Sequence, residues 1–218
     1  FRRICQRLST ETSTQYQSLL IRGMKQLKTP QVASFLLDYL LNNPLCQYDP
    51  KKLLGIIASY RNRDTFAPLL EQLKTESKHN ASILTALLTI TGFDQNIQDF
   101  EELTNDRRWT EKAHPFHEDL LLRLFQCLVD VKQHNAALGL WPGLAWMQDK
   151  AADQVLSDAV NVMQEVEIPS MIQAINYRLK RREGSPDALL RLLEHKSADV
   201  QFLAAESLSL NGHAQGFN

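Results

Sequence analysis

Several common features are absent from the 218-residue sequence, and each absence excludes a class of protein. No apolar run approaches the ~20 residues that a helix needs to cross a bilayer, and we expect no signal peptide before Phe1. The three cysteines, Cys5, Cys46 and Cys127, lack metal-binding or redox spacing and cannot all pair with one another. We therefore expect a cytoplasmic protein without membrane contact, whose thiols are buried in a reducing compartment.

Signals for strands and for catalysis are also missing. The sequence has no sustained alternation of apolar and polar residues and no Asn-Gly hairpin turn. It contains no glycine-rich phosphate loop, no nucleophile elbow and no HExxH motif. The carboxylate pairs Glu101-Glu102 and Glu118-Asp119 lie among charged neighbours, not in the apolar surroundings that suit a general acid. These absences favour an all-α, non-catalytic protein with no cofactor and no evident small-molecule substrate.

The overall charge gives no sign of a strongly charged ligand. The chain contains 24 Lys and Arg residues against 25 Asp and Glu residues, which gives a net charge of -1 and a pI of about 6.7. A near-neutral chain has no global field that attracts nucleic acid or an anionic membrane surface. Composition therefore disfavours a nucleic-acid partner.

Residues 187–212 contain two apolar helical segments separated by a tight turn. The first carries a leucine stripe, and the second has apolar residues at helical spacing. Asp199 is positioned to accept backbone N–H bonds at the start of the second segment, and Gly212 suits a helix C-terminus that requires a left-handed residue. The stretch therefore predicts a helix pair. We expect the seam between its helices to contain Leu193, Ala204 and Leu208.

The same pattern recurs earlier in the chain. Residues 69–92 align without gaps on 189–212. A second self-match, shifted by 33 positions, places the apolar residues of 20–40 on those of 53–73. A third copy begins at Asp94. Periods of about 30–40 residues with two helices each are typical of an α-solenoid.

Apolar periodicity predicts helices along most of the chain, with short loops marked by proline and glycine. The expected helices cover 10–28, 30–42, 50–61, 64–75, 80–91, 95–104, 116–132, 134–147, 151–166, 168–182, 187–196 and 198–211.

The unit at 187–212 resembles a HEAT repeat of the short bacterial type first described in phycobilin lyases. The resemblance implies a HEAT- or armadillo-like superhelix of antiparallel helix pairs. It also implies an extended groove that binds a partner, without naming the ligand.

The period is interrupted once, which divides the chain into three parts. We expect one block of HEAT-like helix pairs at 1–104, an irregular junction or insertion at 105–118, and a second block at 119–218. Both chain ends look like the middle of a repeat. The second block is therefore expected to be truncated within a longer array.

The candidate partner-binding residues fall in two basic clusters: Arg178, Lys180, Arg181 and Arg182, and Arg107 and Arg108 with Trp109. The first cluster could contact a phosphate group or an acidic partner. It also suits a solvated helix C-terminus, where cations are favoured by the helix dipole. The second could combine stacking with charge, or could be a partly buried tryptophan with solvated arginines.

Two further motifs have a structural explanation. His114 and His117 can bind metals, but the proline between them argues against a shared helical face, so no metal is predicted. Trp141 and Trp146 could form an aromatic pocket, although packing between helices is the expected role.

These observations favour a non-catalytic scaffold that binds a protein partner along the solenoid groove. Two alternatives remain. Some HEAT-like proteins are DNA alkylation glycosylases, which would need a basic concave face with aromatic residues and an acidic residue for base removal. The repeat type also permits a tetrapyrrole lyase or its chaperone.

Overall fold

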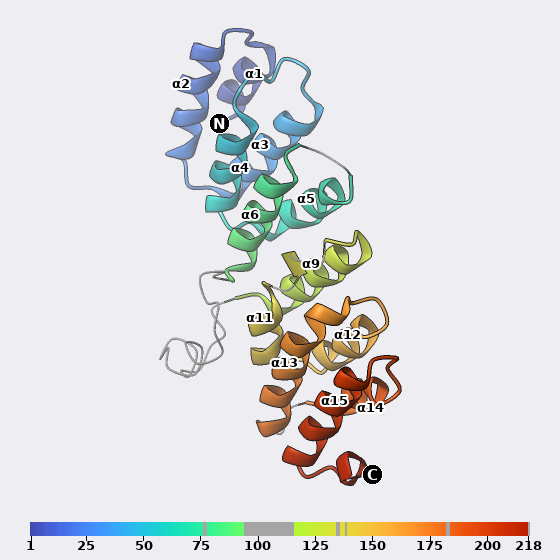
Figure 1. Cartoon of the computed structure of the whole chain (residues 1–218). Coiled ribbons are helices and arrows are strands. Elements are labelled where there is room, and N and C mark those ends of the chain that lie inside the picture. The colour runs from blue at the N-terminus through green and yellow to red at the C-terminus, as the bar shows by residue number, and fades with distance from the viewer. Residues whose placement is uncertain (76–77, 94–115, 134–135, 138, 182–183, 218) are drawn as a thin grey trace. The chain divides into compact units, whose positions relative to one another are not determined.

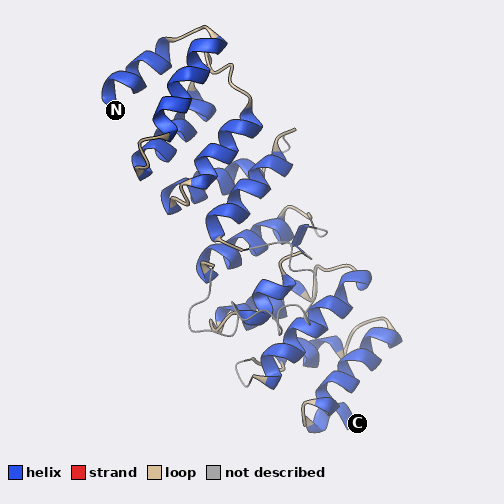
Figure 2. Ribbon diagram, turned by 90° about the vertical axis from the view of Figure 1, so that its left-hand side faces the viewer, coloured by secondary structure: helices blue, strands red, loops and turns tan. Residues whose placement is uncertain are grey.

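The computed structural model is all-helical and describes residues 1–75, 78–93, 116–133, 136–137, 139–181 and 184–217. Within these ranges it contains twelve α-helices and no strand (Figure 2). The helices belong to two compact units, Phe1–Gly92 and Phe93–Asn218. Residues 105–115 of the expected junction lie outside the described ranges, so its irregular character stays a prediction. No helix in the described part is long and apolar enough to cross a membrane.

The described part of the first unit contains six α-helices, labelled in Figure 1, and one 3₁₀ helix. They are α1 (Arg2–Thr10), α2 (Thr14–Lys25), α3 (Pro30–Asn42), α4 (Pro50–Ser59), η1 (Arg63–Thr65), α5 (Phe66–Leu73) and α6 (Asn80–Thr91). Helix α4 packs against both α3 and α6, and α5 packs against α6. The fully buried side chains between them include Leu36, Leu53, Ile57, Phe66 and Leu69.

The second unit forms two rows of helices. One row contains α9 (Glu118–Asp130), α12 (Ala151–Ala159) and α14 (Asp187–Leu192). The other contains α11 (Trp141–Trp146), α13 (Ile168–Lys180) and α15 (Ala198–Leu210). The 3₁₀ helices η2 (Glu165–Glu167) and η3 (Ala214–Phe217) precede α13 and follow α15. Helices α14 and α15 pack together and close the unit (Figure 1).

Proline and glycine set several helix boundaries as the sequence indicates. Pro30 and Pro50 occupy the first positions of α3 and α4, where a missing backbone N–H costs no intrahelical bond. Gly92 and Gly212 follow α6 and α15 with φ of 79° and 78°, the left-handed conformation that ends a helix. This confirms the predicted role of Gly212. Asp199 forms no side-chain cap bond, because α15 begins at Ala198 with Ser197 as its N-cap residue.

The expected helix at 10–28 is wrong at its start. Helix α1 ends at Thr10, and α2 begins at Thr14. The carboxylate of Glu11 accepts hydrogen bonds from the backbone N–H groups of Thr12 and Ser13, at 3.1 and 3.0 Å. These bonds satisfy backbone donors in the turn and stabilise the break.

Candidate binding grooves

The predicted basic clusters are only partly described. Arg107, Arg108, Trp109 and Arg182 lie outside the described residues. Lys180 is exposed at the end of α13, while Arg181 is half-buried and Arg178 is fully buried. The structure therefore brings three of the seven candidate residues to one helix end, in three different environments.

Arg178 is a buried structural residue, and its expected solvated position is wrong. Its Nε donates to Oδ1 of Asp153 at 2.8 Å. Its terminal nitrogens donate to the backbone carbonyls of Leu144, Met147 and Asp149. Leu144 lies in the last turn of α11, and Met147 and Asp149 follow the end of that helix. The guanidinium is therefore satisfied internally and is not available to a partner.

Arg181 packs on aromatic rings. Its guanidinium carbon lies 4.7 Å from the ring centroid of Trp146 and 5.7 Å from that of Tyr177. This geometry is a cation–π interaction. Trp141 and Trp146 are both buried, and the Trp141 ring lies 4.9 Å from that of Phe125. The expected packing role of the tryptophan pair is confirmed.

The two units carry net charges of opposite sign, which nearly cancel in the net charge of the whole chain. Phe1–Gly92 contains 12 Lys and Arg residues and 6 Asp and Glu residues, a net charge of +6. Phe93–Asn218 contains the other 12 basic residues and 19 acidic residues, a net charge of -7. Counting charge by block, instead of over the whole chain, reveals this division from the sequence alone.

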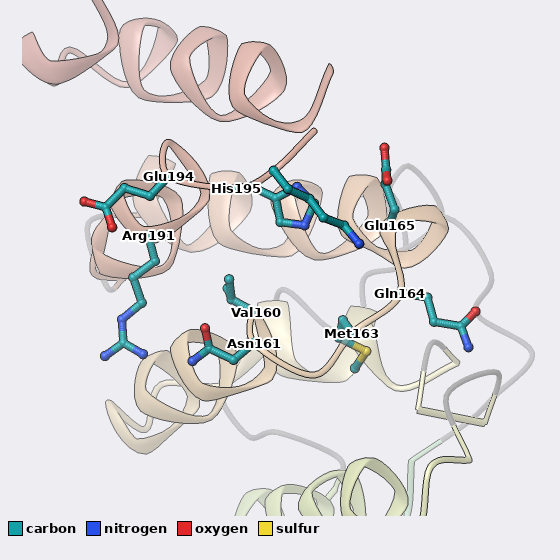
Figure 3. A pocket seen from close by; sticks show the side chains of 9 residues that line it. Val160, Asn161, Met163, Gln164, Glu165, Arg191, Glu194 and His195 are labelled. Atoms are coloured by element: carbon teal, nitrogen blue, oxygen red, sulfur yellow. The ribbon is translucent and has the colours of Figure 1, made fainter. Parts of the chain in front are cut away.

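A groove of about 870 Å³ lies in the second unit, between the segment after α12 and the end of α14. Figure 3 shows Arg191 and Glu194 at one end of it and Gln164 and Glu165 at the other, with His195 between them. Val160 and Met163 supply apolar surface. The groove therefore combines both signs of charge with a small apolar area.

Polar groups of this groove are bonded to the protein itself. Nη1 of Arg191 donates to the carbonyl of Ser157 at 3.1 Å, and it lies 3.8 Å from Oδ1 of Asp158. Nδ1 of His195 accepts the backbone N–H of Ser197 at 3.1 Å. The Ser197 hydroxyl donates to the Glu165 carboxylate. These bonds hold neighbouring loops together and engage Arg191 and Glu165, which leaves Glu194 and Lys196 as the exposed charges that a partner could use.

A second groove, of about 430 Å³, lies between α2 and α4 in the first unit. Its lining residues on α2 are spaced so that they share one helical face: Thr14, Ser18, Arg22 and Lys25. The opposite wall comes from α4 and the loop before it: Tyr48, Asp49, Lys52 and Ile56. Three cations therefore line one small groove. We call it the α2–α4 groove.

A third groove, of about 320 Å³, follows on the other side of α4, between α4 and α6. Small side chains such as Ala58, Ala81 and Ala86 line it, with Lys51 at its edge. Gly55 also lines it, and a Cβ added there would meet no atom within 4 Å. The exposed residues of α4 therefore form a ridge between two grooves, and α2, α4 and α6 present one open surface.

The described residues hold no arrangement suited to metal chemistry. No group of three or more His, Cys, Asp or Glu side chains in these ranges is placed to hold a metal ion. Burial raises the pKa of the Cys5 and Cys46 thiols and of the Tyr60 hydroxyl, which keeps each group neutral at physiological pH. All three groups therefore occur as weak nucleophiles in the described structure.

Comparison of the chain with protein-family models, curated proteins and solved structures found no match. The resemblance to HEAT repeats therefore remains a prediction from the sequence.

Proposed function

We propose that this chain is a non-catalytic protein-interaction scaffold, built from helix pairs stacked as in a HEAT-like α-solenoid. The two rows of helices in the second unit support the stacked arrangement, because the described helices of this unit alternate between the rows along the chain. Stacked repeats contact only their neighbours and create extended surfaces for partners.

Hydrogen bonds at a recurring sequence offset also support the stack. The Tyr60 hydroxyl donates to the carbonyl of Met24, 36 residues earlier, and Asn62 donates to the carbonyl of Pro30, 32 residues earlier. In the second unit, Asn211 donates to Oδ1 of Asn176, 35 residues earlier. Such bonds join equivalent parts of successive helix pairs. A near-constant offset in both units is what repetition of one structural unit produces.

The observation that carries the proposed function is the open surface of α2, α4 and α6. These helices contain four cations, Arg22, Lys25, Lys51 and Lys52, and no acidic residue. All four cations are exposed, and none has an ion-pair partner among the described residues. A predominantly basic surface next to open grooves favours an acidic partner.

The chemistry of the surface favours a protein over a nucleic acid. Ile56 places an apolar side chain in the α2–α4 groove. Backbone phosphates gain nothing from this isoleucine and would interact with the cations alone. A protein segment can use the cations and the apolar surface together.

A site-specific photo-cross-linking experiment tests the scaffold. A photo-reactive phenylalanine analogue is placed at Gly55, where a new side chain has open space, or at exposed Ala67 on α5 as the control. We expect nuclease-resistant, protease-sensitive cross-links from Gly55 and far fewer from Ala67. Equal yields from both positions, or cross-links that nuclease removes, would contradict the proposal.

A further inference from the structure

We infer that the α2–α4 groove binds an acidic peptide segment of the partner protein, about five residues long. This inference deepens the proposed function and rests on it. It identifies the groove, the chemical class of the ligand and the side chains that recognise it.

The length of the groove sets the length of the ligand. Its lining residues on α2 extend from Thr14 to Lys25. A rise of 1.5 Å per helical residue makes this wall about 16 Å long. An extended peptide advances about 3.3 Å per residue, so about five residues fit along the wall.

The groove supplies positive charge that the protein leaves uncompensated. Arg22 and Lys25 lie on one wall and Lys52 on the other. The carboxylate in the groove, Asp49, caps α4 by accepting the backbone N–H of Lys51 at 2.9 Å. One carboxylate cannot neutralise three cations. Carboxylates of a bound peptide would form charge-assisted hydrogen bonds with these side chains and relieve their mutual repulsion.

Hydroxyl groups on the same wall can recognise a peptide backbone. The Ser18 hydroxyl donates to the carbonyl of Thr14 at 2.8 Å. The Thr14 hydroxyl donates to Oε1 of Gln47 at 3.0 Å. The hydrogen of each hydroxyl is already engaged in one of these bonds, so the hydroxyl oxygen can accept a further hydrogen bond. Peptide N–H groups can donate to these oxygens, whereas unprotonated phosphates have no hydrogen to donate.

The groove of the second unit lacks this combination. It contains Glu165 and Glu194 together with its basic residues, and Arg191 is bonded to Ser157 and lies near Asp158. An acidic peptide gains less there, because added carboxylates meet carboxylates already present. The second-unit groove therefore serves as an internal comparison.

Fluorescence anisotropy with the full chain tests the inference. The probe is a fluorescein-labelled glutamate-rich peptide, and the same peptide with glutamine in place of glutamate is its control. The groove variant is Arg22→Glu with Lys52→Glu. The matched variant is Arg2→Glu with Arg3→Glu, which makes the same charge change on exposed residues of α1. Circular dichroism verifies that both variants keep the wild-type helix content.

We expect the groove variant to weaken peptide binding about tenfold or more, and the matched variant by about twofold or less. Equal losses would show general attraction to a basic unit and overturn the inference. No binding of the glutamate peptide by wild type would also overturn it, as would tighter binding of a single-stranded oligonucleotide. If protein cross-links still form at Gly55 in those cases, the scaffold stands and the ligand class is wrong.

Discussion

The Nε of Arg178 donates to Oδ1 of Asp153 at 2.8 Å and thereby joins α13 to α12. The arginine side chain is fully buried, and that of the aspartate is 16% exposed. The same guanidinium bonds the carbonyls of Leu144 and Asp149, which lie in and after α11. One residue therefore connects three helices of the second unit.

Replacement of Arg178 should destabilise the second unit strongly. Arg178→Met keeps much of the volume but leaves the Asp153 carboxylate without its cation. Loss of one partner from a buried ion pair costs about 3–5 kcal/mol. Asp153→Asn keeps an acceptor for Nε and should cost less. Urea unfolding followed by tryptophan fluorescence measures both; an Arg178→Met curve that overlays wild type would show that the pair contributes nothing.

Two glycines should respond in opposite directions to alanine. Gly55→Ala should stabilise the first unit by about 0.5–1 kcal/mol, because α4 has open space there and glycine disfavours a helix interior. Gly212→Ala should destabilise the second unit by about 1 kcal/mol, because Gly212 has a φ of 78°, a left-handed conformation that is unfavourable for alanine. Thermal midpoints of the two variants test this, and shifts of the same sign would show that the assigned backbone conformations are wrong.

The seam between α14 and α15 should depend on Leu208. This side chain is fully buried, as is that of Ala204. Leu208→Ala should therefore cost about 2–5 kcal/mol. Lys180→Ala, an exposed control on α13, should stay within about 0.5 kcal/mol. Chemical denaturation compares them, and similar midpoints would place Leu208 outside the core.

The thiols should react slowly in the native protein. Cys127 is buried, and burial raises the pKa of Cys5 and Cys46. A raised pKa lowers the thiolate fraction at pH 8, and the thiolate is the reactive form. Ellman's reagent should therefore modify native protein much more slowly than protein in urea. Immediate modification of all three thiols without urea would contradict this.

Helix boundaries could be predicted from the sequence where proline or glycine marks them. Pro30, Pro50 and Gly212 mark helix ends in the sequence and in the structure. The break between α1 and α2 was missed, because polar side chains stabilise it: the Glu11 carboxylate and also Gln17. This buried amide donates to the carbonyls of Glu11 and Leu45, at 2.7 Å each. Periodicity treats a glutamine as a surface residue, so it cannot detect such a contact.

The solvated position expected for Arg178 was wrong, although the sequence contains a signal for the burial of this residue. It follows Met171, Ala174 and Ile175 by seven, four and three residues, so it shares their apolar face of α13. The basic residues after it suggested a solvated helix end instead. Whole-chain charge similarly concealed the basic first unit. The position of Arg178 on the helical face would have revealed its burial, and counting charge separately for each block would have revealed the basic first unit.

Nuclear magnetic resonance of the full chain, titrated with the glutamate-rich peptide, tests the central claim most directly. That claim is that the first unit presents a protein-binding groove between α2 and α4. The account predicts saturable amide shifts concentrated in Thr14–Lys25 and at Tyr48, Lys52 and Ile56. Shifts concentrated instead around Val160–Glu165 and Arg191–Lys196, or shifts spread evenly over all basic residues, would contradict it.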